Sequence, residues 1–212
     1  MCGSRSSVVP CAFWLLLLAG PLAGCGAESP TPRASPAPSP TAKAPTPAPS
    51  GSPKPEATPN PLRLSSLAFA AGAPIPPKHA YKPEGENVSP PLAWTGAPAG
   101  TREFALLCDD LDAPRRELWV HWILYGIPAD RTALAEGETG VGIAGKNDWK
   151  KTEWGGPIPP AGSGVHRYVF RLYALDAPLV LAPGATKPEL LAALKGHVLA
   201  TAELVGTYER KK

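Results

Sequence analysis

The sequence predicts a mostly β domain, a sandwich of strands with short peripheral helices, one of them near the C-terminus. From residue 62 onward, short runs rich in aromatic and aliphatic residues alternate with clusters of Pro and Gly, as strands alternate with turns. Few helical patterns separate these runs, which disfavours a parallel α/β sheet. Residues 62–212 have the length and apolar content of one domain with its own core.

Residues 1–24 are predicted to be a lipoprotein signal peptide. Arg5 supplies a positive charge, residues 8–18 form an apolar stretch, and small residues then lead to a cysteine in the sequence Leu22-Ala23-Gly24-Cys25. The apolar stretch is too short to span a bilayer, which takes about 20 residues. The four-residue sequence resembles the bacterial lipobox, in which the cysteine sulfur is acylated and becomes the first residue of the mature chain.

Cys25 is therefore the expected lipidation site, and the protein is expected to be exported and lipid-anchored to the bacterial cell envelope. Residue 26 is Gly rather than Asp, the inner-membrane retention signal of some bacteria, which favours the outer membrane or cell surface. The alternative is an ordinary secretory signal in which Cys25 plays no part. Cys108 is then the one cysteine left without lipid, so no internal disulfide is expected, and its apolar surroundings predict a buried thiol.

The segment after Cys25 is predicted to be a disordered stalk, Pro/Ala/Ser/Thr-rich and reaching to residue 61. Residues 26–61 contain no aromatic residue and no Val, Leu, Ile or Met, so they cannot build a core. Frequent Pro favours extended polyproline II, which at about 3.1 Å per residue reaches up to ~110 Å. A docking ligand for a proline-binding partner is the alternative function.

Within the domain, strands are predicted at 67–69, 103–108, 119–127, 167–175 and 198–208. A short helix is predicted after Thr186, because threonine caps a helix, Pro188 suits its first turn and Glu189 completes a capping box. Gly196 is the expected stop signal. The net charge of +3 implies no strongly basic surface, so nucleic acid is not an expected partner.

Strand periodicity sorts the polar residues of two strands into faces. In residues 119–127, alternation places His121 on one face together with Trp119, Ile123, Tyr125 and Ile127. In the later strand, His166 and Tyr168 share a face. A Gly/Pro-rich loop at 155–164 precedes them, and ligand-binding groups concentrate on such loops.

Asp110 and Asp112 follow the predicted strand at 103–108. Together with two imidazoles and a phenol, these carboxylates can build a site that hydrogen-bonds a phosphate or carboxylate, with each carboxylate holding a histidine in its donating tautomer. Taken singly, each group has a plainer explanation: a histidine in an apolar strand is more often structural, and an Asp pair before Pro commonly caps a turn. Their combination predicts one small anion pocket.

Five motifs occur together and in order along residues 64–210: NVSPPLAW at 87–94, DDLDAP at 109–114, HW with YGIP within 121–128, GKND at 145–148, and the segment from GPIPP to HRY at 156–168. Together they resemble the phosphatidylethanolamine-binding protein family, in its bacterial Raf-kinase-inhibitor-like branch. The resemblance implies an antiparallel β-sandwich with a C-terminal helix and a surface cavity that accepts phosphate-like anions, including phospholipid head groups.

The resemblance also implies the ligand-binding residues, which are Asp110, Asp112, Trp119, His121, Pro160, His166 and Tyr168. On that basis the two histidines donate N–H groups to the anion, and the Asp pair orients the donors. The chain departs from the family pattern at two places. Leu111 replaces a proline between the two aspartates, and Trp149-Lys150 replaces Phe-Gly, which is expected to put a bulky ring and a cation near the mouth.

The leading hypothesis is an exported lipoprotein that binds a small anionic ligand, such as a phosphoethanolamine-like head group, with no turnover, catalytic residue or cofactor. Its partners are then this ligand and, through Cys25, the membrane. The first alternative is a metal-dependent hydrolase that uses Asp110, Asp112, His121 and His166 as ligands, although no His-x-x-x-His spacing occurs. The second is a module that inhibits an envelope protease or other enzyme, with an unknown protein target.

Overall fold

The structure is a computed structural model that describes residues 61–114 and 118–212. The predicted signal peptide, the lipidation site Cys25 and the stalk up to residue 60 lie outside the described residues and stay predictions. Within the described ranges, no helix has the length and apolar character needed to cross a bilayer.

Two antiparallel sheets form the fold. The larger has five strands in the order β6-β4-β3-β7-β8, with bounds Ile143–Ala144, Trp119–Pro128, Glu103–Asp110, Val165–Leu175 and Val198–Glu209. The smaller has the order β1-β2-β5, with bounds Arg63–Ser65, Leu92–Thr95 and Ala133–Leu134. A 3₁₀ turn at Pro77–His79 and the helix α1 at Lys187–Ala193 complete the elements. The antiparallel pairing confirms the predicted sandwich.

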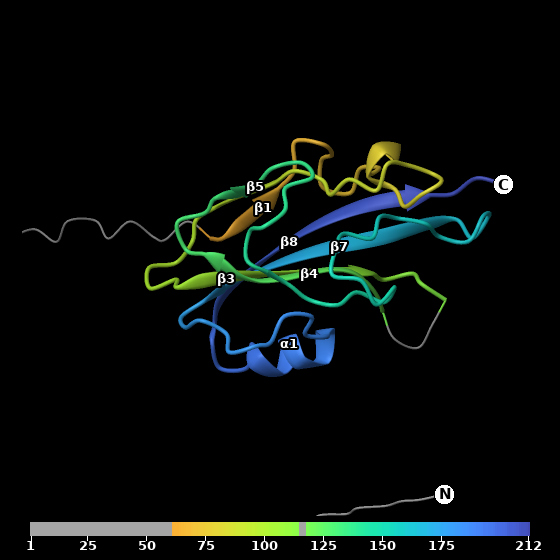
Figure 1. The fold of residues 1–212 in the computed structure, drawn as a ribbon. Helices are drawn as coiled ribbons and strands as arrows, with labels where there is room; N and C mark the ends of the chain where they lie inside the picture. Colours follow the sequence, from red (N-terminus) through yellow and green to blue (C-terminus); the bar gives the residue numbers. More distant parts are fainter. Residues whose placement is uncertain (1–60, 115–117) are drawn as a thin grey trace, which may run out of the picture. The chain divides into compact units, whose positions relative to one another are not determined.

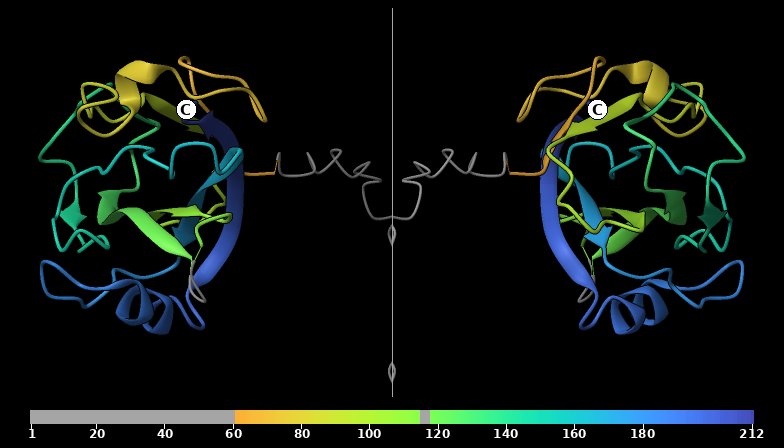
Figure 2. Two further views of the ribbon diagram at one scale, coloured as in Figure 1. Left: turned by 90° about the vertical axis from the view of Figure 1, so that its right-hand side faces the viewer. Right: turned by 90° about the vertical axis from the view of Figure 1, so that its left-hand side faces the viewer.

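The elements stack in layers. The small sheet covers one face of the large sheet, and α1 covers the other (Figures 1 and 2). Residues such as Trp94, Phe104 and Phe170 fill the space between the sheets, while Leu107 and Leu190 belong to a second core on the helix side. Central strand β3 is buried along its whole length because it has a core on both faces.

The predicted helix is confirmed, and a buried ion cluster ties it to the sheet. The Glu189 carboxylate accepts the Thr186 backbone N–H at 2.7 Å, as the capping box requires. Lys187 Nζ lies 2.9 Å from the carboxylate of Asp109, which also binds Arg171. Asp109 is fully buried, and this burial raises its pKa although both cations oppose the effect. The pairing fixes α1 against β3.

The predicted strand at 67–69 is wrong. The first strand is Arg63–Ser65, and the chain bends immediately after it, leaving Leu67 with 94% of its surface exposed. The Ser66 hydroxyl accepts the N–H of Ala68 at 3.1 Å and donates to the carbonyl of Pro91. These side-chain contacts replace strand pairing at this point. The other predicted strands are confirmed to within a few residues, whereas the short β2, β5 and β6 were not predicted.

Strand β4 does not alternate as predicted, because it carries two bulges opposite β3. Cys108 pairs with Trp122 and Asp109 pairs with Val120, so His121 is an extra residue in the ladder. The His121 ring contacts the rings of Trp154 and Tyr168, which belong to the core between the two sheets. Ile123 and Tyr125 belong to the helix-side core. The prediction that these two residues share the face of His121 is therefore wrong.

Candidate functional site

A cavity of about 220 Å³ lies where β3 ends and β4 and β7 begin. Six of the seven predicted ligand-binding residues line it, namely Asp110, Trp119, His121, Pro160, His166 and Tyr168. Trp149 and a few residues of the adjoining loops complete the lining. The three strand ends were predicted to contribute to one site, and the antiparallel order β4-β3-β7 brings them to the same end of the sheet.

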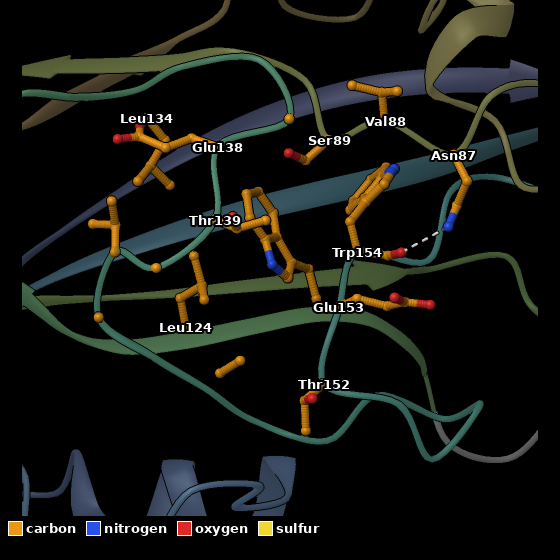
Figure 3. A pocket seen from close by; sticks show the side chains of 16 residues that line it. Asn87, Val88, Ser89, Leu124, Leu134, Glu138, Thr139, Thr152, Glu153 and Trp154 are labelled. Carbon is orange, nitrogen blue, oxygen red and sulfur yellow. Dashed lines mark hydrogen bonds between the residues drawn. The ribbon is translucent and has the colours of Figure 1, made fainter.

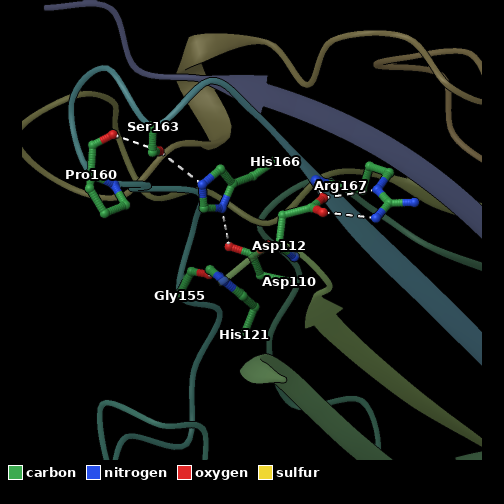
Figure 4. A network of polar contacts seen from close by, with 8 residues as sticks. All are labelled: Asp110, Asp112, His121, Gly155, Pro160, Ser163, His166 and Arg167. Carbon is green, nitrogen blue, oxygen red and sulfur yellow. Dashed lines mark hydrogen bonds and ion pairs between the residues drawn. The ribbon is translucent and has the colours of Figure 1, made fainter. Parts of the chain in front are cut away.

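The centre of the site is a buried carboxylate–imidazole pair. Asp110 Oδ2 lies 2.8 Å from Nδ1 of His166, and both side chains are almost completely buried. The other carboxylate oxygen of Asp110 accepts the backbone N–H of Asp112 at 2.8 Å. Because an ionised carboxylate only accepts hydrogen bonds, Nδ1 of His166 carries the proton. Figure 4 shows this network.

Ser163 completes the network on the other side of His166, and it was not predicted as a site residue. Its Oγ lies 2.9 Å from His166 Nε2 and donates a hydrogen bond of 2.8 Å to the carbonyl of Pro160 (Figure 4). A serine hydroxyl has one proton, so it serves one acceptor at a time. The Gly-Ser-Gly turn three residues before His166 is the sequence signal that points to this contact.

The chain Ser163–His166–Asp110 has the connectivity of a Ser-His-Asp triad. Two contacts argue against a nucleophile. The Ser163 hydroxyl also bonds to the Pro160 carbonyl, and the backbone N–H of Ser163 donates to the same oxygen at 3.1 Å. That N–H is thus engaged rather than available to an oxyanion. The geometry fits a residue that supports His166.

His121 is held as a neutral imidazole. Its Nδ1 lies 2.5 Å from the carbonyl oxygen of Gly155, an acceptor, so Nδ1 carries the proton. Burial lowers the pKa of His121 to about 4, so Nε2 presents a lone pair at neutral pH. Nε2 is buried and has no hydrogen-bond partner within the described residues. His121 was expected to donate an N–H group to an anion, and it can do so through Nε2 only after this nitrogen has been protonated.

Tyr168 supplies the complementary donor. Its hydroxyl is buried and has no hydrogen-bond partner in the described part of the chain. Burial, followed by the nearby Asp110 carboxylate, raises the pKa of Tyr168 far above its usual value, so the phenol keeps its proton. The rings of His121 and Tyr168 are 5.0 Å apart and nearly perpendicular. The cavity thus offers one unpartnered O–H donor and one unpartnered nitrogen acceptor.

Trp149 forms an aromatic wall with Trp119 and Tyr81. Its ring stacks on Tyr81 with centroids 4.8 Å apart and meets Trp119 edge to face at 5.1 Å. A Cβ atom on Gly155 would lie 2.5 Å from the Trp149 ring, so only glycine allows this packing. The expected bulky ring near the mouth is present, whereas Lys150 lines a different cavity beside α1.

Asp112 does not line the cavity. Its carboxylate accepts the backbone N–H, Nε and Nη2 of Arg167, at 2.9, 2.9 and 2.8 Å. The hydrogen bonds to Arg167 lower the pKa of Asp112. The described residues include no group of three or more His, Cys, Asp or Glu side chains that could hold a metal ion. In particular, Asp112 of the proposed hydrolase set is turned toward Arg167.

The fold and this cavity define a class, an antiparallel β-sandwich binding protein with a small polar pocket at the end of its larger sheet. Residues 65–209 match the model of the phosphatidylethanolamine-binding protein family, and the chain belongs to this family. The expected family resemblance is confirmed.

Relatives support the bacterial branch. A UPF0098 protein of Methanothermobacter thermautotrophicus is 46% identical over 155 residues, which cover 70% of this chain and 99% of the relative. A predicted lipoprotein, LppC, of Mycobacterium tuberculosis is 44% identical over 150 residues, covering 70% of this chain and 73% of LppC.

Two solved structures resemble the fold. The homologue CT736 of Chlamydia trachomatis has a TM-score of 0.67 at 40% identity and covers 72% of this chain and 99% of its own. YbcL of Escherichia coli has a TM-score of 0.67 at 30% identity, covering 72% and 100%.

Proposed function

We propose that the protein is an exported lipoprotein whose cavity binds a small phosphorylated anion, such as a phosphoethanolamine-like head group, without turnover. The observation that carries this proposal is the buried, unpartnered O–H of Tyr168 in the same cavity as the Asp110–His166 pair. A buried donor without a partner costs about 1–3 kcal/mol, which a ligand oxygen recovers.

The neutral state of His121 favours a ligand that still carries a proton. A phosphate monoester has a second pKa of about 6, so its monoanion keeps one P–OH group. That hydroxyl can donate to Nε2 of His121 while another phosphate oxygen accepts from Tyr168. A fully ionised phosphate would place a further negative charge beside Asp110 with no proton for Nε2.

The cavity dimensions favour a head group over a whole lipid. Its volume of about 220 Å³ is below the roughly 300–1,000 Å³ of pockets that hold drug-sized ligands. Trp119, Trp149 and Pro160 give it apolar walls, which suit the carbon atoms of an ethanolamine group.

The anchor at Cys25 completes the proposed function. The lipobox-like sequence and the Pro-rich stalk support export and attachment to the cell envelope, with the outer membrane or cell surface favoured over the inner membrane. The relative LppC, a predicted lipoprotein, supports the same assignment.

The test is calorimetric titration of the mature chain with inorganic phosphate and phosphoethanolamine, together with thermal unfolding. At a hundredfold excess over Kd, a true ligand adds about 2.7 kcal/mol to the stability of the folded protein. Binding should disappear in His166→Ala and weaken in Tyr168→Phe, which keeps the ring. Absence of heat with both anions, with the wild-type protein folded, would overturn the proposal.

A further inference from the structure

A second cavity, of about 320 Å³, lies between the small sheet and the β4–β6 edge of the large sheet. Figure 3 shows its lining, with Val88 and Ser89 above, Leu134 and Glu138 on one side and Thr152 below. It shares no lining residue with the first cavity. The two cavities can therefore be altered independently.

Polar groups without partners lie at its floor and rim. Ser89 and Trp122 are 6% and 5% exposed, and within the described residues neither the Ser89 hydroxyl nor the Trp122 indole N–H makes a hydrogen bond. The Thr139 and Thr152 hydroxyls at the rim also have no hydrogen-bond partner in the described chain. Both polar atoms are accessible from the cavity, so the Trp122 N–H can donate a hydrogen bond to an occupant and the Ser89 hydroxyl can donate or accept one.

The loop over the cavity adds open backbone donors. In the described structure, the N–H groups of residues 139–142 make no hydrogen bond to a backbone carbonyl. Gly140 and Gly142 have φ values of 79° and 66°, each following a residue with negative φ. Such alternation turns successive N–H groups toward the same side. A Cβ at Gly142 would lie 2.6 Å from the carbonyl of Tyr125, so the loop conformation needs glycine there.

The charges of this cavity argue against an anionic ligand. Its two carboxylates, Glu138 and Glu153, already pair with Arg131 at 2.6 Å and with Lys151 at 3.3 Å. Neither Arg131 nor Lys151 lines the cavity. The lining therefore presents neutral hydroxyl, indole and amide groups beside carboxylate oxygens, which accept hydrogen bonds and repel anions.

Apolar surface completes the lining. Leu124, Leu134 and Val141 contribute aliphatic carbon, and the rings of Trp122 and Trp154 meet edge to face with centroids 5.6 Å apart. A sugar ring matches this combination, because it carries hydroxyl groups that donate and accept around its rim and C–H groups on its faces. The volume lies at the lower end of the usual range of about 300–1,000 Å³, which suits one small ligand.

We propose that this second cavity is a binding site for a neutral polyhydroxylated molecule of the size of a single sugar ring. The proposal is independent of anion binding in the first cavity.

The experiment is saturation-transfer NMR on the mature chain with glucose, N-acetylglucosamine and myo-inositol as probes, followed by titration of each probe that responds. At least one probe should receive saturation. Ser89→Ala and Thr139→Val each remove one hydroxyl with little change in volume. Each variant should raise the Kd of the probe roughly five- to tenfold, because it loses one hydrogen bond to the probe. His166→Ala, in the first cavity, is the matched control and should leave the affinity unchanged.

Three outcomes would overturn the proposal. One is the absence of saturation transfer to all three probes. Another is an affinity that Ser89→Ala and Thr139→Val both leave intact, although thermal unfolding shows that the variants fold. The third is loss of sugar binding in His166→Ala, which would place the sugar in the first cavity. Loss of phosphate binding alone in His166→Ala supports two separate sites.

Discussion

The carbonyl oxygen of Gly155 lies 2.5 Å from Nδ1 of His121, a residue that lines the first cavity. This contact fixes the tautomer of a fully buried histidine and leaves Nε2 as a bare acceptor. The protonation state of His121 therefore links folding, pH and ligand choice.

Acid should destabilise the fold through His121. Burial lowers its pKa to about 4, against about 6.5 in an unfolded chain, so the unfolded state binds the extra proton between these values. Stability should rise with pH across this window, and a fall from pH 7 to pH 4 should remove about 3 kcal/mol. Urea unfolding at several pH values measures this. His121→Gln should flatten the profile between pH 4 and 6.5, and an equally steep profile in that variant would contradict the assignment.

Tyr168→Phe separates binding from folding. The substitution removes a buried hydroxyl without a partner, so the free energy of unfolding should stay the same or rise slightly. Phosphate affinity should fall about 10- to 100-fold, the usual cost of a hydrogen bond to a charged group. Calorimetry and thermal unfolding on the same preparations check both statements. Unchanged affinity in a folded variant would remove Tyr168 from the site.

Asp110→Asn and Asp112→Asn form a matched pair. Asp110 is buried against His166, so its replacement should cost about 1–3 kcal/mol and abolish phosphate binding. The Asp112–Arg167 pair lies at the surface, with Arg167 largely exposed and Asp112 partly exposed, so replacement of Asp112 should cost at most about 1 kcal/mol. Because Asp112 does not line the cavity, its variant should also keep phosphate affinity. A strong loss of binding in Asp112→Asn would restore it to the ligand-binding set.

Gly155→Ala should displace Trp149. The new Cβ would lie 2.5 Å from the Trp149 ring, which stacking on Tyr81 holds in place. Overpacking of this kind costs about 1–3 kcal/mol, and tryptophan fluorescence should change with it. The double variant Gly155→Ala/Trp149→Leu should regain most of the lost stability. Additive losses in the double variant would show that the two residues do not clash.

Cys25→Ser tests the anchor. If Cys25 is acylated, the wild-type protein partitions into the detergent phase of a Triton X-114 extract, and the variant partitions into the aqueous phase. Mass spectrometry of the N-terminal peptide measures the lipid directly. Identical partitioning of both proteins would favour the ordinary secretory signal.

Strand regularity decided which parts of the site could be predicted from the sequence. Strand β7 pairs with β8 without a break from Val165 to Ala174 and with β3 from Tyr168 to Leu175, so simple alternation placed His166 and Tyr168 together correctly. Strand β4 carries bulges, and alternation failed at His121 because the extra residue is visible only in the ladder with β3.

Two site features depended on contacts that periodicity does not encode. Ser163 bonds to His166 through a tight turn, and a turn hydroxyl has several possible acceptors. Asp112 was expected in the cavity beside Asp110, but Arg167 offers it a backbone and two side-chain donors. A long-range ion pair of this kind is decided by which side chains the fold brings together.

The neighbours Asp109 and Asp110 point to opposite faces of β3, one toward the cations that hold α1 and the other toward His166. An insertion or deletion of one residue within β3 would turn both carboxylates to the opposite face of the strand, which would separate Asp109 from its cations and Asp110 from His166. Homologues of this chain can therefore vary in length after residue 112 far more readily than between residues 103 and 110. The register of a single strand thus restricts which insertions and deletions the lineage can accept.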